Sequence, residues 1–228
     1  VEHLEHRAGK DAEGKTGDGV GILLQIGHKF FKKLPKKPAL RWATSVTTAL
    51  AVLFPQEELN RNQDKKLLDQ SAKRGAQLPW LARSATCPEI LGHKARSCMP
   101  SIWQAFVERP ARVKPGIDFD RKLYVARRVF EQSSQDTYVC SLSSRTIVYK
   151  GMFLVKELRL FYPDLQSEDY ESAIGYGATA VFTNTATQLG TAPHPNRFIL
   201  PNGEINTIRG NVDTMLAREE TIGSNYLK

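Results

Sequence analysis

Apolar residues cluster or alternate in short segments that predict strands. Residues 19–27, GVGILLQIG, form an apolar run flanked by glycines, which predicts a buried strand. Residues 43–54 are rich in Val, Thr and Leu and predict a second strand, ended by Pro55. Alternation over 137–149, interrupted by Ser143-Ser144-Arg145, predicts a hairpin or a bent strand pair. Further short strands are expected at 78–82, 102–107, 178–185 and 197–200.

Other segments repeat their apolar residues with helical spacing. Residues 57–74 predict a helix followed by Gly75, a suitable residue just beyond a helix end. A second helix is expected to start at a cap formed by Asp118 or Asp120 and to run to residue 132. Its buried stripe is expected to be Phe119, Leu123, Ala126 and Phe130.

Three more helices are expected in the second half of the chain. A short one covers 152–161, and Ser167 with Asp169 and Glu171 is expected to open another. The last covers 208–221 and is expected to turn Met215 and Leu216 inward. Strands and helices are mixed without a strict strand–helix–strand rhythm, which favours an α+β fold over a doubly wound sheet.

Composition narrows the class of protein without pointing to a cofactor. The chain has 228 residues, 41% hydrophobic and 25% charged, as in ordinary globular domains. Its longest apolar stretch, 47–54, is too short to cross a bilayer. Three cysteines at spacings of 11 and 42 match no zinc pattern, and an odd count favours a reducing compartment. No phosphate-binding glycine motif is present, and the histidines lack ligand spacing, so neither cofactor nor metal is expected.

The net charge of +8 is concentrated in one run between residues 29 and 41. The run contains no acidic residue and is broken by two prolines. It predicts contact with an acidic partner or a nucleic acid, or else a solvated loop. Its cations are Lys29, Lys32, Lys33, Lys36, Lys37 and Arg41.

Three stretches occur together in an order that resembles a known family. They are LEHRAG at 4–9 with GKTGDGVGILLQI at 14–26, RKLYVARR at 121–128 with YVCSLSSRTIVYKGM at 138–152, and NGEINTIRGN at 202–211. The chain resembles the glutamine amidotransferase domain of the glutamate synthase large subunit. The resemblance implies one class II amidotransferase-like domain over 1–228. It also implies a four-layer αββα sandwich of the N-terminal-nucleophile hydrolase type.

The resemblance also implies a reaction and a set of site residues. Class II amidotransferases hydrolyse glutamine to glutamate and ammonia with an N-terminal cysteine as nucleophile. Asn202 and Gly203 match the oxyanion hole of the family, although Asn-Gly is also an ordinary tight-turn pair. Arg7 matches an arginine near the nucleophile, or is a structural arginine paired with a carboxylate. Asp18 is interpreted as a turn or strand-end residue.

The departures from the family pattern concern the catalytic residues. Where the family has HSRFSTNT, residues 178–185 read ATAVFTNT, so Ala180 replaces the arginine that clamps the substrate carboxylate. Pro201 replaces a polar residue before Asn202, and no cysteine precedes Cys87. The family's first strand and its later Asp motif are also missing. We therefore expect a catalytically inactive domain, without a substrate clamp, that serves as a structural or binding subunit of a larger protein assembly.

Two alternatives stay open. In the first, the chain is the glutaminase domain of a glutamate synthase whose nucleophilic cysteine lies upstream of Val1. In the second, it is a module that binds nucleic acid through the basic run. The sequence therefore leaves open whether the protein is an enzyme, and favours a protein without enzymatic activity. The expected location is a reducing compartment inside the cell, with the mitochondrial matrix or plastid stroma favoured over a bacterial cytoplasm.

Overall fold

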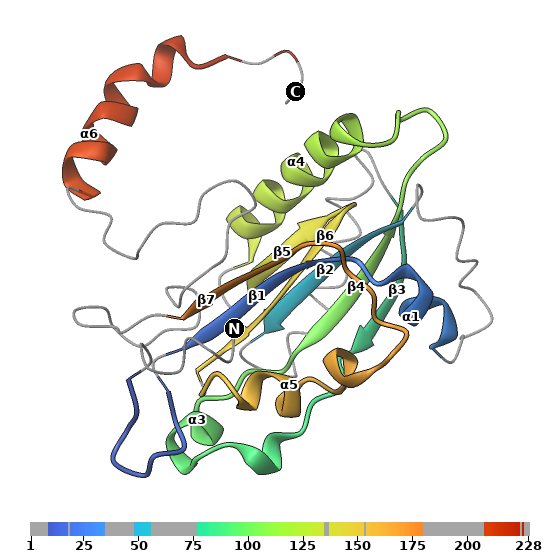
Figure 1. Ribbon diagram of the computed structural model, residues 1–228. Coiled ribbons are helices and arrows are strands. Elements are labelled where there is room, and N and C mark those ends of the chain that lie inside the picture. Colours follow the sequence, from blue (N-terminus) through green and yellow to red (C-terminus); the bar gives the residue numbers. More distant parts are fainter. Residues whose placement is uncertain are drawn as a thin grey trace.

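Two antiparallel sheets form the centre of the fold (Figure 1). The computed structural model describes residues 9–17, 19–34, 48–55, 77–134, 137–152, 154–179, 208–223 and 225. The smaller sheet has the order β6-β1-β7. Its strands are β1 (Val20–Gln25), β6 (Thr146–Gly151) and β7 (Gly175–Thr179). The larger sheet has the order β3-β4-β2-β5. Its strands are β2 (Thr48–Pro55), β3 (Gln77–Arg83), β4 (Trp103–Glu108) and β5 (Thr137–Ser143).

One hydrophobic core joins the two sheets. A single cluster of buried residues contains Leu23 and Ile147 from the smaller sheet, and Val52 and Phe106 from the larger one. Phe31, from the short helix α1 (His28–Lys33), is fully buried in the same cluster. Its ring meets that of Phe106 edge to face, with 5.8 Å between centroids. The predicted strand at 19–27 is confirmed as β1, and its burial follows from this packing.

Helix α4 (Ile117–Ser133) covers the face of the larger sheet that looks away from this core. The predicted stripe of the helix is confirmed, because the four residues named for it are all buried. Phe130 packs with Trp103 and Ala105 of β4. Phe119 and Leu123 pack with Val107 of the same strand. Alternate residues of β4 therefore face α4, as the two-residue period of a strand requires.

The predicted cap of α4 is wrong. The residue before the helix is Gly116, with φ 80° and no capping side chain. Asp118 and Asp120 lie instead within the first turn, where carboxylates still favour the helix dipole. Asp118 accepts a hydrogen bond from Arg121, and Asp120 reaches the connection between β5 and β6. Both carboxylates are thus used for other contacts than the cap.

Strands β5 and β6 are not a hairpin with its own ladder, because they belong to different sheets. The Val148 N–H donates to Ser141 Oγ at 3.2 Å, and the Cys140 thiol lies 3.6 Å from the Val148 carbonyl oxygen. Side chains thus connect β5 and β6, whereas the two strands of a hairpin are joined by backbone hydrogen bonds. Of the two sequence interpretations, the bent strand pair describes this corner and the hairpin does not.

Short helices close one end of the sandwich, below the sheets in Figure 1. They are η3 (Pro88–Ile90), α3 (His93–Ser97), α5 (Glu157–Phe161) and η4 (Pro163–Gln166). Helix α5 is shorter than the predicted 152–161. The helix predicted from Ser167 is wrong, because the Tyr170 N–H closes a single turn onto the Ser167 carbonyl. Asp169 is used in ion pairs with α1 rather than in a helix.

The last described elements are α6 (Ile208–Arg218) and η5 (Glu219–Thr221), which confirm the predicted helix at 208–221. The inward orientation predicted for Met215 and Leu216 is wrong, because these side chains are 56% and 59% exposed. Figure 1 shows α6 away from both sheets. The segments predicted at 57–74, 180–185 and 197–200 lie outside the described residues. The fold is α+β, and the described part contains one helix layer over two sheets.

Candidate functional site

The strand that leads to position 180, where the resembled family has its substrate-clamping arginine, lies at the edge of the smaller sheet. β7 pairs antiparallel with β1, with Thr179 opposite Val20 and Ala178 opposite Gly21. It begins at Gly175, three residues earlier than predicted. Ala180 follows directly and lies outside the described residues, as do Arg7, Asp18, Asn202 and Gly203. The structure therefore fixes the strand before the clamp position, and the expected oxyanion hole stays a prediction.

Ion pairs hold two cations of the basic run against an acidic segment distant in sequence. Lys29 Nζ lies 2.7 Å from Glu171 and 3.4 Å from Asp169, and Lys33 also pairs with Asp169. The hydrogen bond and charge of Glu171, then Asp169, raise the pKa of Lys29. Lys33 likewise lowers the pKa of Asp169. The run itself contains no acidic residue, but acidic side chains from a distant part of the sequence pair with two of its six cations.

The rest of the basic run divides between described and undescribed residues. Lys32 is exposed on α1, and its charge adds to the burial that lowers the pKa of His28. Lys36, Lys37 and Arg41 lie outside the described residues. The contact with an acidic partner or a nucleic acid stays a prediction. Fewer cations are available for it than the sequence suggested, because Lys29 and Lys33 already form ion pairs.

A lysine that the sequence did not single out lies buried at the end of β6. Lys150 is only 1% exposed, and its amine donates to the Tyr138 hydroxyl at 3.0 Å. The amine also lies 4.5 Å from the centroid of the Tyr138 ring, within cation–π range. Burial disfavours the ammonium form and lowers the pKa of Lys150 to about 8. The site therefore holds an amine that loses its proton around pH 8.

The thiol beside this lysine is unreactive. Burial raises the pKa of Cys140 to about 12, although the charge of Lys150 acts in the opposite direction. A thiol in that state is a poor nucleophile at neutral pH. Cys87 is half-buried and Cys98 is exposed, and all three cysteines are free.

A second buried polar cluster lies in the core between the sheets. Asp164 Oδ2 accepts hydrogen bonds from Gln104 and from the Tyr149 hydroxyl, each at 3.0 Å. Burial nevertheless raises the pKa of Asp164 above its ordinary value. Tyr162, whose ring packs on Tyr149, donates to the Lys150 carbonyl oxygen at 2.9 Å. These bonds tie α5 and η4 to β6 and β4, which gives the cluster a structural role.

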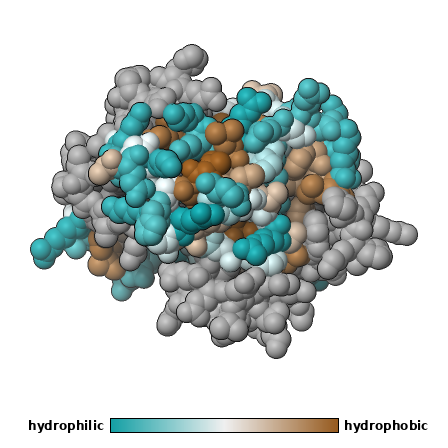
Figure 2. Space-filling model, turned by 90° about the horizontal axis from the view of Figure 1, so that it is seen from below, coloured by the Kyte–Doolittle hydropathy of each residue, from teal (hydrophilic) through white to brown (hydrophobic). Residues whose placement is uncertain are grey.

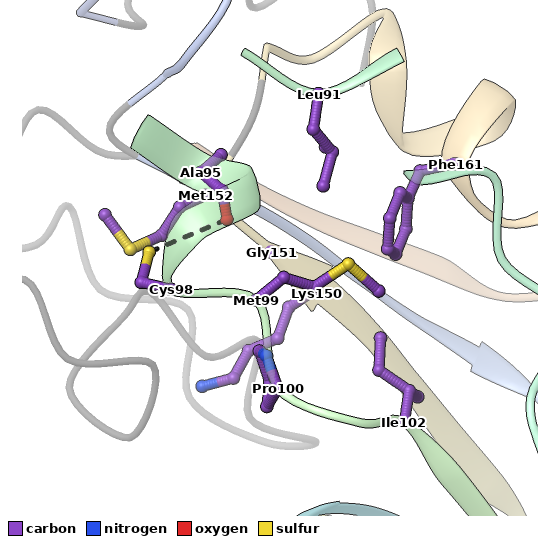
Figure 3. A pocket seen from close by; sticks show the side chains of 10 residues that line it. All are labelled: Leu91, Ala95, Cys98, Met99, Pro100, Ile102, Lys150, Gly151, Met152 and Phe161. Atoms are coloured by element: carbon purple, nitrogen blue, oxygen red, sulfur yellow. Dashed lines mark hydrogen bonds between the residues drawn. The ribbon is translucent and has the colours of Figure 1, made fainter. Parts of the chain in front are cut away.

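A small apolar cavity lies where α3, α5 and the end of β6 meet (Figure 3). Its volume is about 30 Å³, room for about two water molecules. Figure 3 shows Met99, Ile102 and Phe161 converging at one side, with the Lys150 amine directed away from them. The lining residues are Leu91, Ala95, Cys98, Met99, Pro100, Ile102, Lys150, Gly151, Met152 and Phe161. A cavity this small does not hold a nucleotide or flavin.

Comparison with known proteins decides the family. A family model described as glutamine amidotransferases class-II matches residues 1–228. The chain belongs to this family. It is 37% identical over 229 residues to the glutamate synthase [NADPH] large chain of Bacillus subtilis (strain 168), covering 95% of this chain. It is also 37% identical over 228 residues to the ferredoxin-dependent glutamate synthase 1, chloroplastic/mitochondrial, of Arabidopsis thaliana, covering 96% of this chain.

A third relative of this class-II amidotransferase is the glutamate synthase [NADPH] large chain of Azospirillum brasilense, 35% identical over 221 residues and covering 94% of this chain. The chain spans about 14% of the length of these three relatives. Among the described residues, no group of three or more His, Cys, Asp or Glu is placed to hold a metal ion. No helix in the described ranges is long and apolar enough to cross a membrane.

Proposed function

We propose that this class-II amidotransferase domain does not hydrolyse glutamine and serves as a structural or binding part of a larger protein assembly. The observation that carries the proposal is Ala180, which stands where the resembled family has the arginine for the substrate carboxylate. A methyl group neither donates a hydrogen bond nor carries charge, wherever it is placed. The strand before it is formed and paired with β1, so the loss concerns the side chain and not the sheet.

We expect the binding free energy lost with this arginine to be large enough to prevent glutamine hydrolysis. An arginine binds a carboxylate through two parallel charge-assisted hydrogen bonds. Removing such a contact from a buried site costs on the order of 2–5 kcal/mol. That range corresponds to a fall in affinity of roughly 30- to 5000-fold. Pro201, which precedes the Asn202–Gly203 pair, adds a second change next to the expected oxyanion hole.

The larger assembly is proposed from the proportions of the relatives. These glutamate synthases are about seven times longer than the matched region, because the chain spans 14% of each. We therefore propose that this domain packs against neighbouring domains or subunits. The αββα sandwich belongs to the same proposal, with α4 as the helix layer already present. The location that we propose is a reducing compartment within the cell, as a mitochondrial matrix, a plastid stroma or a bacterial cytoplasm provides.

Titration of the full-length protein with glutamine tests the proposal. We expect no heat of binding at millimolar glutamine for the natural sequence. Ala180→Arg is expected to restore detectable binding, whereas Ala180→Lys is expected to restore less because an ammonium lacks the two-pronged geometry. Glutamine binding by the natural sequence with micromolar affinity would overturn the proposal.

The second candidate is an active glutaminase domain that supplies ammonia to a synthase. The observation that favours it is the match to glutamate synthases over nearly the whole chain at up to 37% identity. Sequencing of the mature N-terminus, together with labelling by a glutamine-like electrophile, separates the two candidates. A cysteine at the mature N-terminus that takes up the label supports the enzyme. Any other first residue, without labelling, supports the inactive domain.

A further inference from the structure

The end of the sandwich formed by α3 and α5 combines an apolar centre with a charged rim. The half-buried side chains of Met99 and Met152 line the cavity there, and Leu160 on α5 is 50% exposed. Figure 2 shows this end of the molecule, with apolar atoms gathered near the middle and hydrophilic side chains around them. We call this surface the α3–α5 face.

The charged side chains of the α3–α5 face are mostly cations without ion pairs. Lys94 and Arg96 lie on α3, and Lys156 and Arg159 lie at α5; all four are exposed. Within the part of the chain that the structure describes, none of the four has an acidic partner within ion-pair distance.

The acids of the same elements do not neutralise this rim. Glu157 is buried, and its carboxylate accepts the Leu154 N–H at 3.0 Å. Glu13 accepts the His93 N–H at the start of α3, and Glu89 is exposed on η3. This end of the molecule therefore carries four cations without ion pairs and two exposed carboxylates, those of Glu13 and Glu89. The basic run on α1 shows the opposite arrangement, because Asp169 and Glu171 cover Lys29 there.

We propose that the α3–α5 face is a docking surface for an acidic protein segment that inserts one apolar side chain into the cavity. The cavity, at about 30 Å³, has room for the end of one Leu, Ile or Met side chain. Carboxylates beside that anchor meet Lys94 and Arg96 on α3 and Lys156 and Arg159 at α5. Such complementarity sets the orientation and speeds association.

Two other classes of partner fit the face less well. Proteins that bind single-stranded nucleic acid stack its bases on exposed aromatic rings, whereas the aromatic residue of this cavity, Phe161, is 2% exposed. A membrane surface is bound by several protruding apolar side chains. Among the described residues of α3 and α5, Leu160 is the one large apolar side chain that is exposed by half. The proposal is independent of whether the domain hydrolyses glutamine.

Zero-length cross-linking of the full-length protein in its natural assembly tests the proposal. A water-soluble carbodiimide joins lysine amines to carboxylates that touch them, and mass spectrometry identifies the joined peptides. We expect Lys94 and Lys156 to be joined to one Asp/Glu-rich segment outside residues 1–228 that also contains a large apolar residue. Lys114, which is exposed between β4 and α4, serves as the internal control and is expected to give no such product.

A synthetic peptide of the joined segment then measures the contribution of each feature. Reversal of charge in Lys94→Glu with Lys156→Glu is expected to weaken peptide binding at least tenfold, with a steep dependence on salt. Met99→Gln is expected to weaken binding several-fold by making the cavity wall polar. The matched control, Arg112→Glu with Lys114→Glu, changes the net charge equally at the far end of β4 and is expected to stay within twofold.

Three outcomes would overturn the proposal. One is that Lys94 and Lys156 give no product with carboxylates outside residues 1–228. Another is that the joined segment has no excess of acid or no apolar residue. The third is that ultraviolet cross-linking or vesicle flotation shows the face on nucleic acid or on anionic lipid instead. Thermal unfolding of each variant confirms that the fold is intact before its binding is compared.

Discussion

At the scale of single residues, Lys150 shows how the fold sets the chemistry of a side chain. In sequence it follows Tyr149 in a strand whose residues alternate, where a lysine is ordinarily taken for a solvated position. In the structure it is buried, with the Tyr138 hydroxyl 3.0 Å from its amine. The signal that could have found it is the lack of any other charged residue between residues 146 and 151.

Lys150 gives the unfolding free energy a characteristic dependence on pH. Its pKa is about 8 in the fold and 10.5 in the unfolded chain, a difference worth about 3 kcal/mol. Between these values the unfolded chain binds more protons, so this contribution makes the fold more stable as the pH rises from 8 to 10.5. Denaturant titrations from pH 7.5 to 10 should show that rise in the natural protein relative to Lys150→Met. A constant difference between the two proteins across this range contradicts the assignment.

Asp120 links α4 to the corner between β5 and β6. Its carboxylate accepts hydrogen bonds from the Ser144 N–H at 2.9 Å and hydroxyl at 2.8 Å, and from Arg145 at 2.7 Å. Burial acts to raise the pKa of Asp120, but these bonds outweigh it and hold the pKa below its ordinary value. The carboxylate therefore stabilises the fold above its unfolded pKa, and this contribution is lost as the pH falls through the folded value.

Replacing this carboxylate should be costly. Asp120→Ala is expected to lower the free energy of unfolding by about 2–3 kcal/mol at pH 7, because charge-assisted bonds to a partly buried group are lost. Asp118→Ala is the control on the same helix, and its exposed pair with Arg121 predicts a loss below about 1 kcal/mol. Chemical denaturation measures both variants, and equal losses would contradict the role of Asp120 at the corner.

At the scale of elements, α4 is the helix that the sequence predicted most completely. Its apolar residues repeat at helical spacing without a break, so their burial depended little on what else was nearby. The caps were predicted less well, because Asp118 and Asp120 had tertiary partners that a local pattern does not contain.

The packing of α4 predicts a large difference between its two faces. Phe130→Ala is expected to cost about 3–5 kcal/mol of unfolding free energy, since a fully buried ring leaves a cavity against Trp103 and Ala105. Tyr124→Ala lies on the same helix with its side chain 51% exposed, and should cost less than about 1 kcal/mol. Thermal or denaturant unfolding of both variants checks this, and similar costs would argue against α4 as a packed layer.

Sequence patterns predicted the strands better than their partners. Alternation over 137–149 correctly indicated two strands around Ser143-Ser144-Arg145, but alternation does not say which sheet a strand joins. At this corner the contacts are tertiary. Arg145 donates to the Asp120 carboxylate, and the Val148 N–H donates to the Ser141 hydroxyl. In the same way, the acidic partners of Lys29 come from residues about 140 positions away.

At the scale of the whole molecule, two sheets share one core, and α4 closes one side of the pair. The fold class followed from the mixture of periodicities, whereas Arg7, Asn202 and Gly203 are expected as site residues only from the resemblance and stay a prediction. Isolated Arg and Asn-Gly carry no signal of chemistry, because the same residues form ordinary ion pairs and turns. The α3–α5 face was not predicted, since its cations lie on two short segments about 60 residues apart in sequence.

We propose that this member of the class-II amidotransferases does not hydrolyse glutamine. The most direct measurement is the release of ammonia from glutamine by the full-length protein in its natural assembly, followed with an enzyme-coupled assay beside a glutamate synthase as positive control. We expect a rate indistinguishable from buffer, for the natural sequence and for Ala180→Ser alike. Ammonia release by the natural sequence that is well above buffer and abolished by a glutamine-like electrophile would contradict it.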